Sequence, residues 1–133
     1  MALTTPDPII PYELNKSVRD AFEGLLRPIL FRDEAFRRVE SGLITFETRL
    51  RVAEHSSAPG ARKARQLLTA AQRLFTQAKA NPGAAFVPHV LAAIDYLVKE
   101  TDEIPDFSNE KSFVDDQQVI DAVSRHFRLL EVP

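Results

Sequence analysis

The feature that most limits the fold of this chain is the spacing of its apolar residues, which recur every three or four positions through most of its length. That spacing places them on one side of an α-helix, whereas a half-buried strand would alternate apolar and polar residues. We find no such alternation, and the chain contains only four glycines. The sequence therefore predicts an all-α protein, a compact single-domain bundle of four to five helices.

Proline and glycine divide the chain into five predicted helices. Residues 1–11 are rich in proline and are expected to form a flexible arm ahead of a single helical domain at 12–133. Each helix of that domain is expected to bury one apolar stripe, and Pro28 is expected to break or kink the first helix. The helices are predicted over about 14–29, 33–55, 61–80, from Pro88 to before Ile104, and 116–130.

The second predicted helix has the most regular pattern. Its apolar residues alternate in steps of three and four, as in a heptad repeat: Phe36, Val39, Leu43, Phe46, Leu50 and Ala53. Such a seam over 36–53 could pair two copies of the chain, so self-association as a homodimer is one hypothesis. It could equally pack antiparallel helices within one chain. The seam is shorter than the ~3 to 4 heptads of sustained coiled coils, so packing within the bundle is favoured.

Composition narrows the class of protein. Of the 133 residues, 44% are hydrophobic and 27% charged, which is typical of a soluble globular protein. A net charge of −2 gives no general attraction for nucleic acid or an anionic membrane, and the absence of cysteine excludes disulfides and thiolate chemistry. No signal-peptide pattern opens the chain, and the longest apolar tract, 90–98, is too short to span a bilayer. We therefore expect a cytoplasmic protein without a membrane span.

Charge is distributed unevenly along the chain. No acidic residue occurs between Glu54 and Asp95. Basic residues collect there instead: Arg62, Lys63, Arg65, Arg73 and Lys79. Because the arginines on one helix face are interleaved with Gln and Thr and not with aromatic residues, the pattern favours a solvated helix face over a nucleic-acid site. This basic helix is expected to dock near the acidic segment that follows, with Arg62 and Arg73 as candidates for contact with a protein partner.

The acidic segment DEIPDFSNEKSFVDD, residues 102–116, has the features of a connection between two helices. Pro105 ends the fourth helix, because Ile104 before it is disfavoured in the α conformation. Asp115 is predicted to be the N-cap of the fifth helix, with Gln118 as its capping-box partner. Asp116 then falls in the first turn, where the helix dipole favours a negative charge.

Apolar residues are expected to pack this turn onto the bundle. Val114 and Val119 occupy the hydrophobic-staple positions around the predicted N-cap. Ile104, Phe107 and Phe113 are expected to be buried together, because three large apolar side chains are rarely all exposed. The segment is therefore predicted to be a packed turn with acidic edges.

A divalent-cation site is the competing interpretation of the same segment. Asp102, Asp106, Asp115 and Asp116 could supply the oxygen ligands that Mg²⁺ and Ca²⁺ prefer, and could support a metal-dependent hydrolase. Their spacing does not match the calcium-binding loop, so the structural interpretation is favoured and no cofactor is predicted. Asp102 and Asp106 remain the better metal candidates because capping does not account for them. With Phe107, they are also candidates for contact with a partner.

Nothing in the sequence supports a catalytic set. The three histidines, His55, His89 and His126, form no helical i, i+4 pair with one another or with an acid. No nucleophile-elbow glycine pattern surrounds a serine, and no glycine-rich phosphate loop occurs. The sequence therefore gives no support for enzymatic activity.

One segment resembles a known family. The run AIDYLVKETDEIPDFSNEKSFVDDQQVIDAV, residues 93–123, is similar to the core of the YkvA-like family of small helical bacterial domains of unknown function. The matching residues are Tyr96, Asp102, Ile104, Pro105, Asp106, Phe107, Phe113, Val114, Asp115, Asp116 and Val119. Polar residues at Ser108 and Asn109 replace apolar ones of the family, which argues against the membrane association of many relatives. The resemblance implies a bacterial protein with a helical hairpin around an acidic turn, and no activity.

These observations favour a non-catalytic adaptor or regulatory module that presents helices and the acidic turn to a protein partner. A cation site in the turn and self-association through the 36–53 seam are the alternatives.

Overall fold

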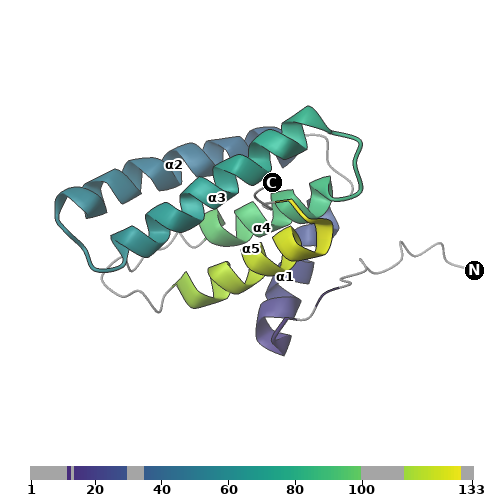
Figure 1. Cartoon of the computed structure of the whole chain (residues 1–133), viewed down its shortest axis with the longest axis horizontal. Coiled ribbons are helices and arrows are strands. Elements are labelled where there is room, and N and C mark those ends of the chain that lie inside the picture. The colour runs from purple at the N-terminus through teal and green to yellow at the C-terminus, as the bar shows by residue number, and fades with distance from the viewer. Residues whose placement is uncertain (1–11, 13, 30–34, 100–112, 130–133) are drawn as a thin grey trace, which may run out of the picture.

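The computed structural model describes residues 12, 14–29, 35–99 and 113–129, and these form helices and short connections (Figure 1). The helices in this part of the chain are α1 (Lys16–Ile29), α2 (Ala35–His55), α3 (Ala61–Ala80), α4 (Val87–Lys99) and α5 (Val114–Phe127). No strand occurs among the described residues. The prediction of an all-α bundle is confirmed.

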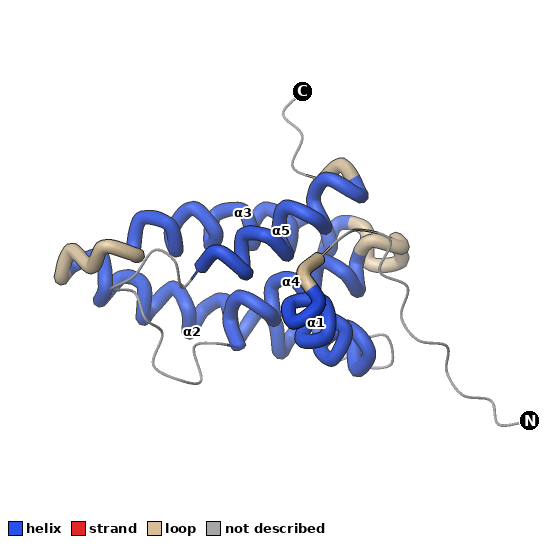
Figure 2. The backbone as a smooth tube through the Cα atoms, turned by 90° about the horizontal axis from the view of Figure 1, so that it is seen from below, coloured by secondary structure: helices blue, strands red, loops and turns tan. Residues whose placement is uncertain are grey.

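The helix α4 is the centre of the bundle, because it packs against each of the other four helices. The long helices α2 and α3 run side by side, and α1 crosses at one end (Figures 1 and 2). Side chains on several faces of α4 are therefore buried. They include the predicted stripe of Val90, Leu91, Ile94, Leu97 and Val98, and also Ala92 and Ala93. The expectation of one stripe per helix is therefore wrong for α4, since a helix surrounded by others is apolar on most sides.

One hydrophobic core joins the five helices. The largest fully buried side chains are Phe22, Leu26, Val39, Phe46, Leu50, Leu67, Leu68, Leu74, Val90, Ile94, Leu97 and Ile120. The seam over 36–53 contributes to this core, with Val39, Phe46 and Leu50 at most 1% exposed. The seam thus packs within the chain, and a second copy could not use it without opening the bundle. Self-association through that seam is incompatible with this packing.

Gly42 lies where α2 approaches α4. A β-carbon built on it would stand 2.7 Å from Cγ2 and 3.3 Å from Cβ of Val98. Carbon atoms in contact normally lie about 3.5–4.0 Å apart, so even one added methyl group meets the side chain of Val98 there. The glycine lets the two helices pack at this distance.

The predicted start of the fifth helix is wrong by two residues. The helix α5 begins at Val114, and Phe113 is its N-cap residue, with no side-chain cap hydrogen bond of its own. Asp115 therefore lies inside the first turn, too late to act as N-cap, and Gln118 has no capping-box role. Phe113 is 2% exposed. Its burial fixes where the chain enters the helix.

The staple and dipole predictions at the same helix start have different outcomes. Val114 is 58% exposed, so it does not pack against the buried Val119 as a hydrophobic staple. Asp115 and Asp116 both lie in the first turn, as the dipole interpretation of Asp116 predicts. Asp116 is nevertheless 1% exposed, a burial that nothing in its local sequence indicates.

The last helix ends earlier than the predicted Leu130. Arg128 adopts a left-handed conformation (φ 56°, ψ 47°), and the N–H of Leu129 donates to the carbonyl of Ser124 (2.9 Å). This is the pattern of a Schellman motif, which usually has glycine at the left-handed position. Ser57 (φ 59°) plays the same role after α2, where the N–H of Ala58 donates to Ala53 (2.9 Å). Because neither position is glycine, the sequence signal for these ends is weak.

Candidate functional site

Several predicted site residues lie outside the described residues: Asp102, Ile104, Pro105, Asp106 and Phe107. Their roles as metal ligands, interaction residues or turn residues therefore stay predictions. The N-terminal arm, residues 1–11, lies outside them as well.

The two aspartates of the acidic segment that are described do not form a joint site. Asp115 is exposed, whereas its neighbour Asp116 is buried. Within the described ranges, no group of three or more histidines, aspartates and glutamates is arranged to hold a metal ion. The cation site therefore stays a prediction, since Asp102 and Asp106 lie outside the described residues.

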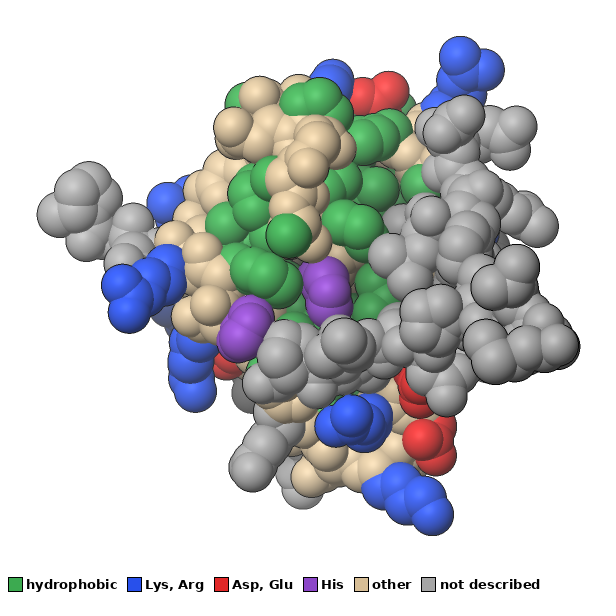
Figure 3. Space-filling model, turned by 90° about the vertical axis from the view of Figure 1, so that its right-hand side faces the viewer, with side chains coloured by type: hydrophobic (Ala, Val, Ile, Leu, Met, Phe, Trp, Pro, Cys, Tyr) green, Lys and Arg blue, Asp and Glu red, His purple; other side chains and the backbone are tan. Residues whose placement is uncertain are grey.

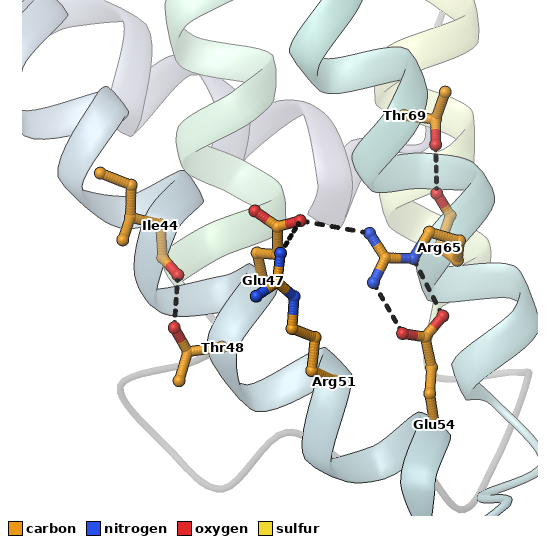
Figure 4. Close-up of polar contacts among 7 residues, drawn as sticks. All are labelled: Ile44, Glu47, Thr48, Arg51, Glu54, Arg65 and Thr69. Atoms are coloured by element: carbon orange, nitrogen blue, oxygen red, sulfur yellow. Dashed lines mark hydrogen bonds and ion pairs between the residues drawn. The ribbon is translucent and has the colours of Figure 1, made fainter.

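Two basic residues of α3, Arg65 and Lys79, pair with acidic residues of α2, and Figure 4 shows the pairs of Arg65. One edge of the Arg65 guanidinium group donates two hydrogen bonds to Glu54, with Nη2 at 2.6 Å from Oε1 and Nε at 2.9 Å from Oε2. Its Nη1 lies 3.6 Å from Glu47, and Lys79 Nζ lies 3.5 Å from Glu40. The hydrogen bonds from Arg65 hold the pKa of Glu54 below its usual range. These two cations thus pair with α2, and the expected docking of α3 near the acidic segment stays a prediction, because residues 100–112 lie outside the described residues.

The two α3 arginines proposed for partner contact remain open to solvent. Arg62 and Arg73 are both exposed. Tyr96 of the YkvA-like motif lies on α4 and is partly buried against the core.

The solvent-facing side of α2 carries an uncharged strip that the sequence analysis did not identify. We call it the outer strip: Ser41, Ile44, Thr45, Thr48 and Val52, all exposed. Ile44 is 62% and Val52 68% exposed, and with Val114 they are the large exposed hydrophobic residues of the described part. Ile44, Thr48 and Val52 are spaced four apart and so share one helix face. The sequence pattern could have predicted this strip, because its positions lie on the side of α2 opposite the buried apolar seam.

Charge pairs flank the outer strip on both edges of α2. On the edge toward α3 lie the pairs of Glu40, Glu47 and Glu54 described above, and Arg51 adds a bond to Glu47 (3.3 Å). On the edge toward α4, Arg38 binds Asp95 (3.0 Å), whose side chain is 11% exposed. Together these pairs tie α2 to both neighbours.

A second cluster lies at the end of the bundle where α1 begins, α4 begins and α5 ends. We call it the histidine cluster: Tyr12, Phe86, His89, His126 and Phe127. The rings of His89 and His126 lie 5.1 and 4.7 Å from that of Phe127, and Tyr12 lies 5.7 Å from His126. Figure 3 shows two histidine side chains close together among hydrophobic ones on this end.

The polar contact of the histidine cluster joins Tyr12 to His89. The tyrosine hydroxyl lies 2.8 Å from Nδ1 of His89, so it donates when that nitrogen is unprotonated. Burial raises the pKa of Tyr12 well above its usual value despite the nearby charge of Arg19, which keeps the hydroxyl protonated. Burial also lowers the pKa of His89, and the charge of His126 lowers it further. His89 is therefore held neutral near pH 7.

Sequence reasoning missed the histidine cluster because its members come from three elements far apart in the chain. Tyr12 and His89 are separated by 77 positions. A search for helical i, i+4 pairs cannot find such a contact, and no local motif marks it.

Comparisons with known proteins do not identify the chain. No protein-family model, curated protein or solved structure matches it. The resemblance of residues 93–123 to the YkvA-like family therefore stays a prediction. Among the described residues, no helix has the length and apolar character needed to cross a membrane.

Proposed function

We propose that this protein is a non-catalytic helical module that binds a protein partner through the outer strip of α2. The observation that carries the proposal is the exposure of Ile44 and Val52 on one face of α2, with only uncharged residues between them on that face. Exposed aliphatic residues grouped on one helix face, with a charged rim, are typical of protein interfaces.

The rigidity of α2 supports this role. The charge pairs with α3 and α4 hold the helix on both edges, and Leu50 and Phe46 anchor its inner face in the core. A partner would therefore bind a preformed ridge and lose little conformational entropy in doing so. Because Glu40, Glu47 and Glu54 already pair with cations of the chain, the exposed Arg37 favours a partner whose rim is acidic.

The test compares partner capture by the wild type and by the double variant Ile44→Ser, Val52→Ser. Both side chains are exposed, so the variant should fold, which circular dichroism checks. Losing two apolar contacts of about 1–2 kcal/mol each should weaken a specific partner's binding by a factor of about 30 or more. Mass spectrometry of proteins captured from native lysate identifies the partner, and titration of the purified partner measures the dissociation constant.

Val114→Ser is the matched control, because Val114 is similarly exposed but lies on α5. A partner retained by the wild type and by Val114→Ser, but lost by the double variant, supports the proposal. Capture that is the same for all three proteins would contradict it.

A second copy of the chain is another occupant that this surface could accept. Sedimentation at high concentration distinguishes the cases: a dimer abolished by the double variant makes the outer strip a homodimer interface, and a monomer leaves a different protein as the partner. The proposal of a bacterial protein of the YkvA-like type rests on the sequence resemblance alone, and the proposed cytoplasmic location rests on the cysteine-free composition.

A further inference from the structure

The outer strip of α2 has the exposed face of α3 as its neighbour, across a row of ion pairs that joins the two helices. We call this row the ion-pair row: Glu40, Glu47, Arg51, Glu54, Arg65 and Lys79. Figure 4 shows Ile44 and Thr48 of α2 on one side of the pairs of Arg65, and Thr69 of α3 on the other. A partner bound to the outer strip therefore has α3 within reach.

The exposed face of α3 carries cations and no acid. Arg62, Thr69 and Arg73 are exposed, and their steps of seven and four residues place them on one side of the helix. The helix contains no aspartate or glutamate. Neither Arg62 nor Arg73 forms an ion pair with another described residue, and the glutamates of the ion-pair row already contact Arg65 or Lys79. Two arginines are thus left to contact a partner.

The ion-pair row also fixes how α2 and α3 are aligned. Glu40 pairs with Lys79, and Glu54 pairs with Arg65. The step between the two glutamates along α2 therefore matches the step between their cations back along α3, fourteen residues in each. The two helices are antiparallel, and every turn of the outer strip has a known neighbour on α3.

This alignment places the two free arginines at the two ends of the outer strip. Arg73 lies beside the turn of α2 that holds Ile44, and Arg62 lies just beyond the level of Val52. About 12 Å of helix axis separates Ile44 from Val52, and about 16 Å separates the two arginines. An apolar ridge and a parallel pair of cations of similar length therefore lie side by side.

A helix of the partner fits this surface better than a strand or a nucleic acid does. Along their length, α2 and α3 use their backbone groups within each helix, so they offer no edge to which a strand could be added. Ile44, Thr48 and Val52 form a ridge with the four-residue spacing that packs into the side of another helix. Phosphate groups, by contrast, would gain nothing from the two aliphatic side chains of this ridge.

We propose that the partner presents an amphipathic helix that lies along α2 and α3, with its apolar stripe on the outer strip and acidic residues toward Arg62 and Arg73. The inference rests on the proposed function, because it names the kind of partner that the outer strip binds. Charge complementarity carries it, since basic residues on that flank of the partner helix would meet like charge on α3.

The test selects helical peptides that bind the full chain from a displayed library. Each peptide has about 18 residues, or roughly 27 Å of helix, with leucines along one face and random residues elsewhere. Peptides that bind Ile44→Ser, Val52→Ser equally well are set aside, so that the retained peptides depend on the outer strip. We expect acidic residues to outnumber basic ones by about threefold or more on one flank of the leucine face of the retained peptides.

Charge reversal on α3 then tests where the acidic residues bind. Arg62→Glu, Arg73→Glu should weaken the binding of a retained acidic peptide by about tenfold or more in ~0.05 M salt, and by less in ~0.5 M salt. Arg19→Glu, Arg125→Glu is the matched control, because it makes the same change in net charge at exposed positions of α1 and α5. It should leave the affinity within about twofold. Circular dichroism checks that both variants fold.

The outcomes separate this inference from the proposed function. Retained peptides without an acidic bias, or with an affinity that charge reversal on α3 leaves unchanged, would overturn the inference and leave the proposed function standing. A library without any peptide that depends on the outer strip would also overturn it, while capture from lysate tests the proposed function separately. Acidic peptides that need Arg62 and Arg73 but not the outer strip would contradict both. A DNA duplex that binds in that way would assign the α3 face to nucleic acid and refute the inference.

Discussion

Gly42→Ala and Gly24→Ala introduce the same methyl group into two helices with opposite surroundings. Both substitutions should gain about 0.5–1 kcal/mol, because alanine loses less backbone entropy than glycine in a helix. Around Gly24, nothing lies within 4 Å of the added β-carbon, so we expect Gly24→Ala to stabilise the protein by about that amount. Around Gly42, the β-carbon would lie 2.7 Å from Cγ2 of Val98.

The clash at Gly42 should outweigh the gain in helix propensity. Val98 is 5% exposed and β-branched, so its methyl group cannot turn away as the end of a long side chain would. Overpacking of this kind costs about 1–3 kcal/mol. The free energy of unfolding of Gly42→Ala should therefore lie about 1–3 kcal/mol below that of Gly24→Ala, since the propensity gain is common to both. Urea denaturation followed by circular dichroism measures both values.

A double-mutant cycle with Val98→Ala assigns the loss to this contact. Shortening Val98 removes the clashing methyl group, so the combined loss in Gly42→Ala, Val98→Ala should be about 1–3 kcal/mol smaller than the sum of the single losses. The matched pair Gly24→Ala, Val98→Ala should be additive to within about 0.5 kcal/mol. Equal stabilities of Gly42→Ala and Gly24→Ala would show that α2 and α4 do not approach as closely as described.

Three further predictions concern helix ends and charges. Ser57→Gly and Arg128→Gly should each stabilise the protein by about 1 kcal/mol in urea denaturation, because both residues hold left-handed conformations that glycine adopts without strain; destabilisation would contradict the Schellman assignment. Arg65→Gln should lower the unfolding free energy only slightly at neutral pH and less still in about 1 M salt, as expected of exposed ion pairs. The pairing that lowers the pKa of Glu54 stabilises the fold at pH values above 4.5, the ordinary pKa of the group, and this stabilisation is lost as the pH falls through the folded-state pKa. Arg65→Gln should therefore lose less stability than the wild type on acidification. Parallel profiles of stability against pH for the two proteins would refute the pairing.

Local patterns predicted the helices well wherever the chain has strong stop signals. The helix α3 runs from Ala61 to Ala80 as predicted, because Gly60 precedes it and Asn81 caps its end through bonds to the carbonyls of Gln77 and Ala78. The buried face of α2 also follows its heptad pattern. What a local pattern cannot give is which helix lies at the centre, and α4 is buried on several sides because of its neighbours.

The candidate surfaces were harder to predict than the helices. The outer strip follows from the seam by helix geometry, since Ile44, Thr48 and Val52 lie on the opposite face of α2. The histidine cluster depends on the docking of three elements, and neither Tyr12 nor His89 carries a local sign of the other. A surface formed by one helix can thus be predicted from the sequence, whereas a surface formed between helices can be identified only once their arrangement in the fold is known.

The start of α5 shows how capping and burial compete to decide a helix boundary. An N-cap at Asp115 would stabilise the helix by about 0.5–2 kcal/mol, which is what the capping-box pattern offered. Burying the whole side chain of Phe113 stabilises the fold by about 1.5–3 kcal/mol, and its 2% exposure shows that this burial is nearly complete. Burial of Phe113 therefore sets how the chain enters the helix, and the acidic residues then occupy the first turn, where the helix dipole still favours them. A cap that competes with an adjacent aromatic anchor is a weak marker of where a helix begins.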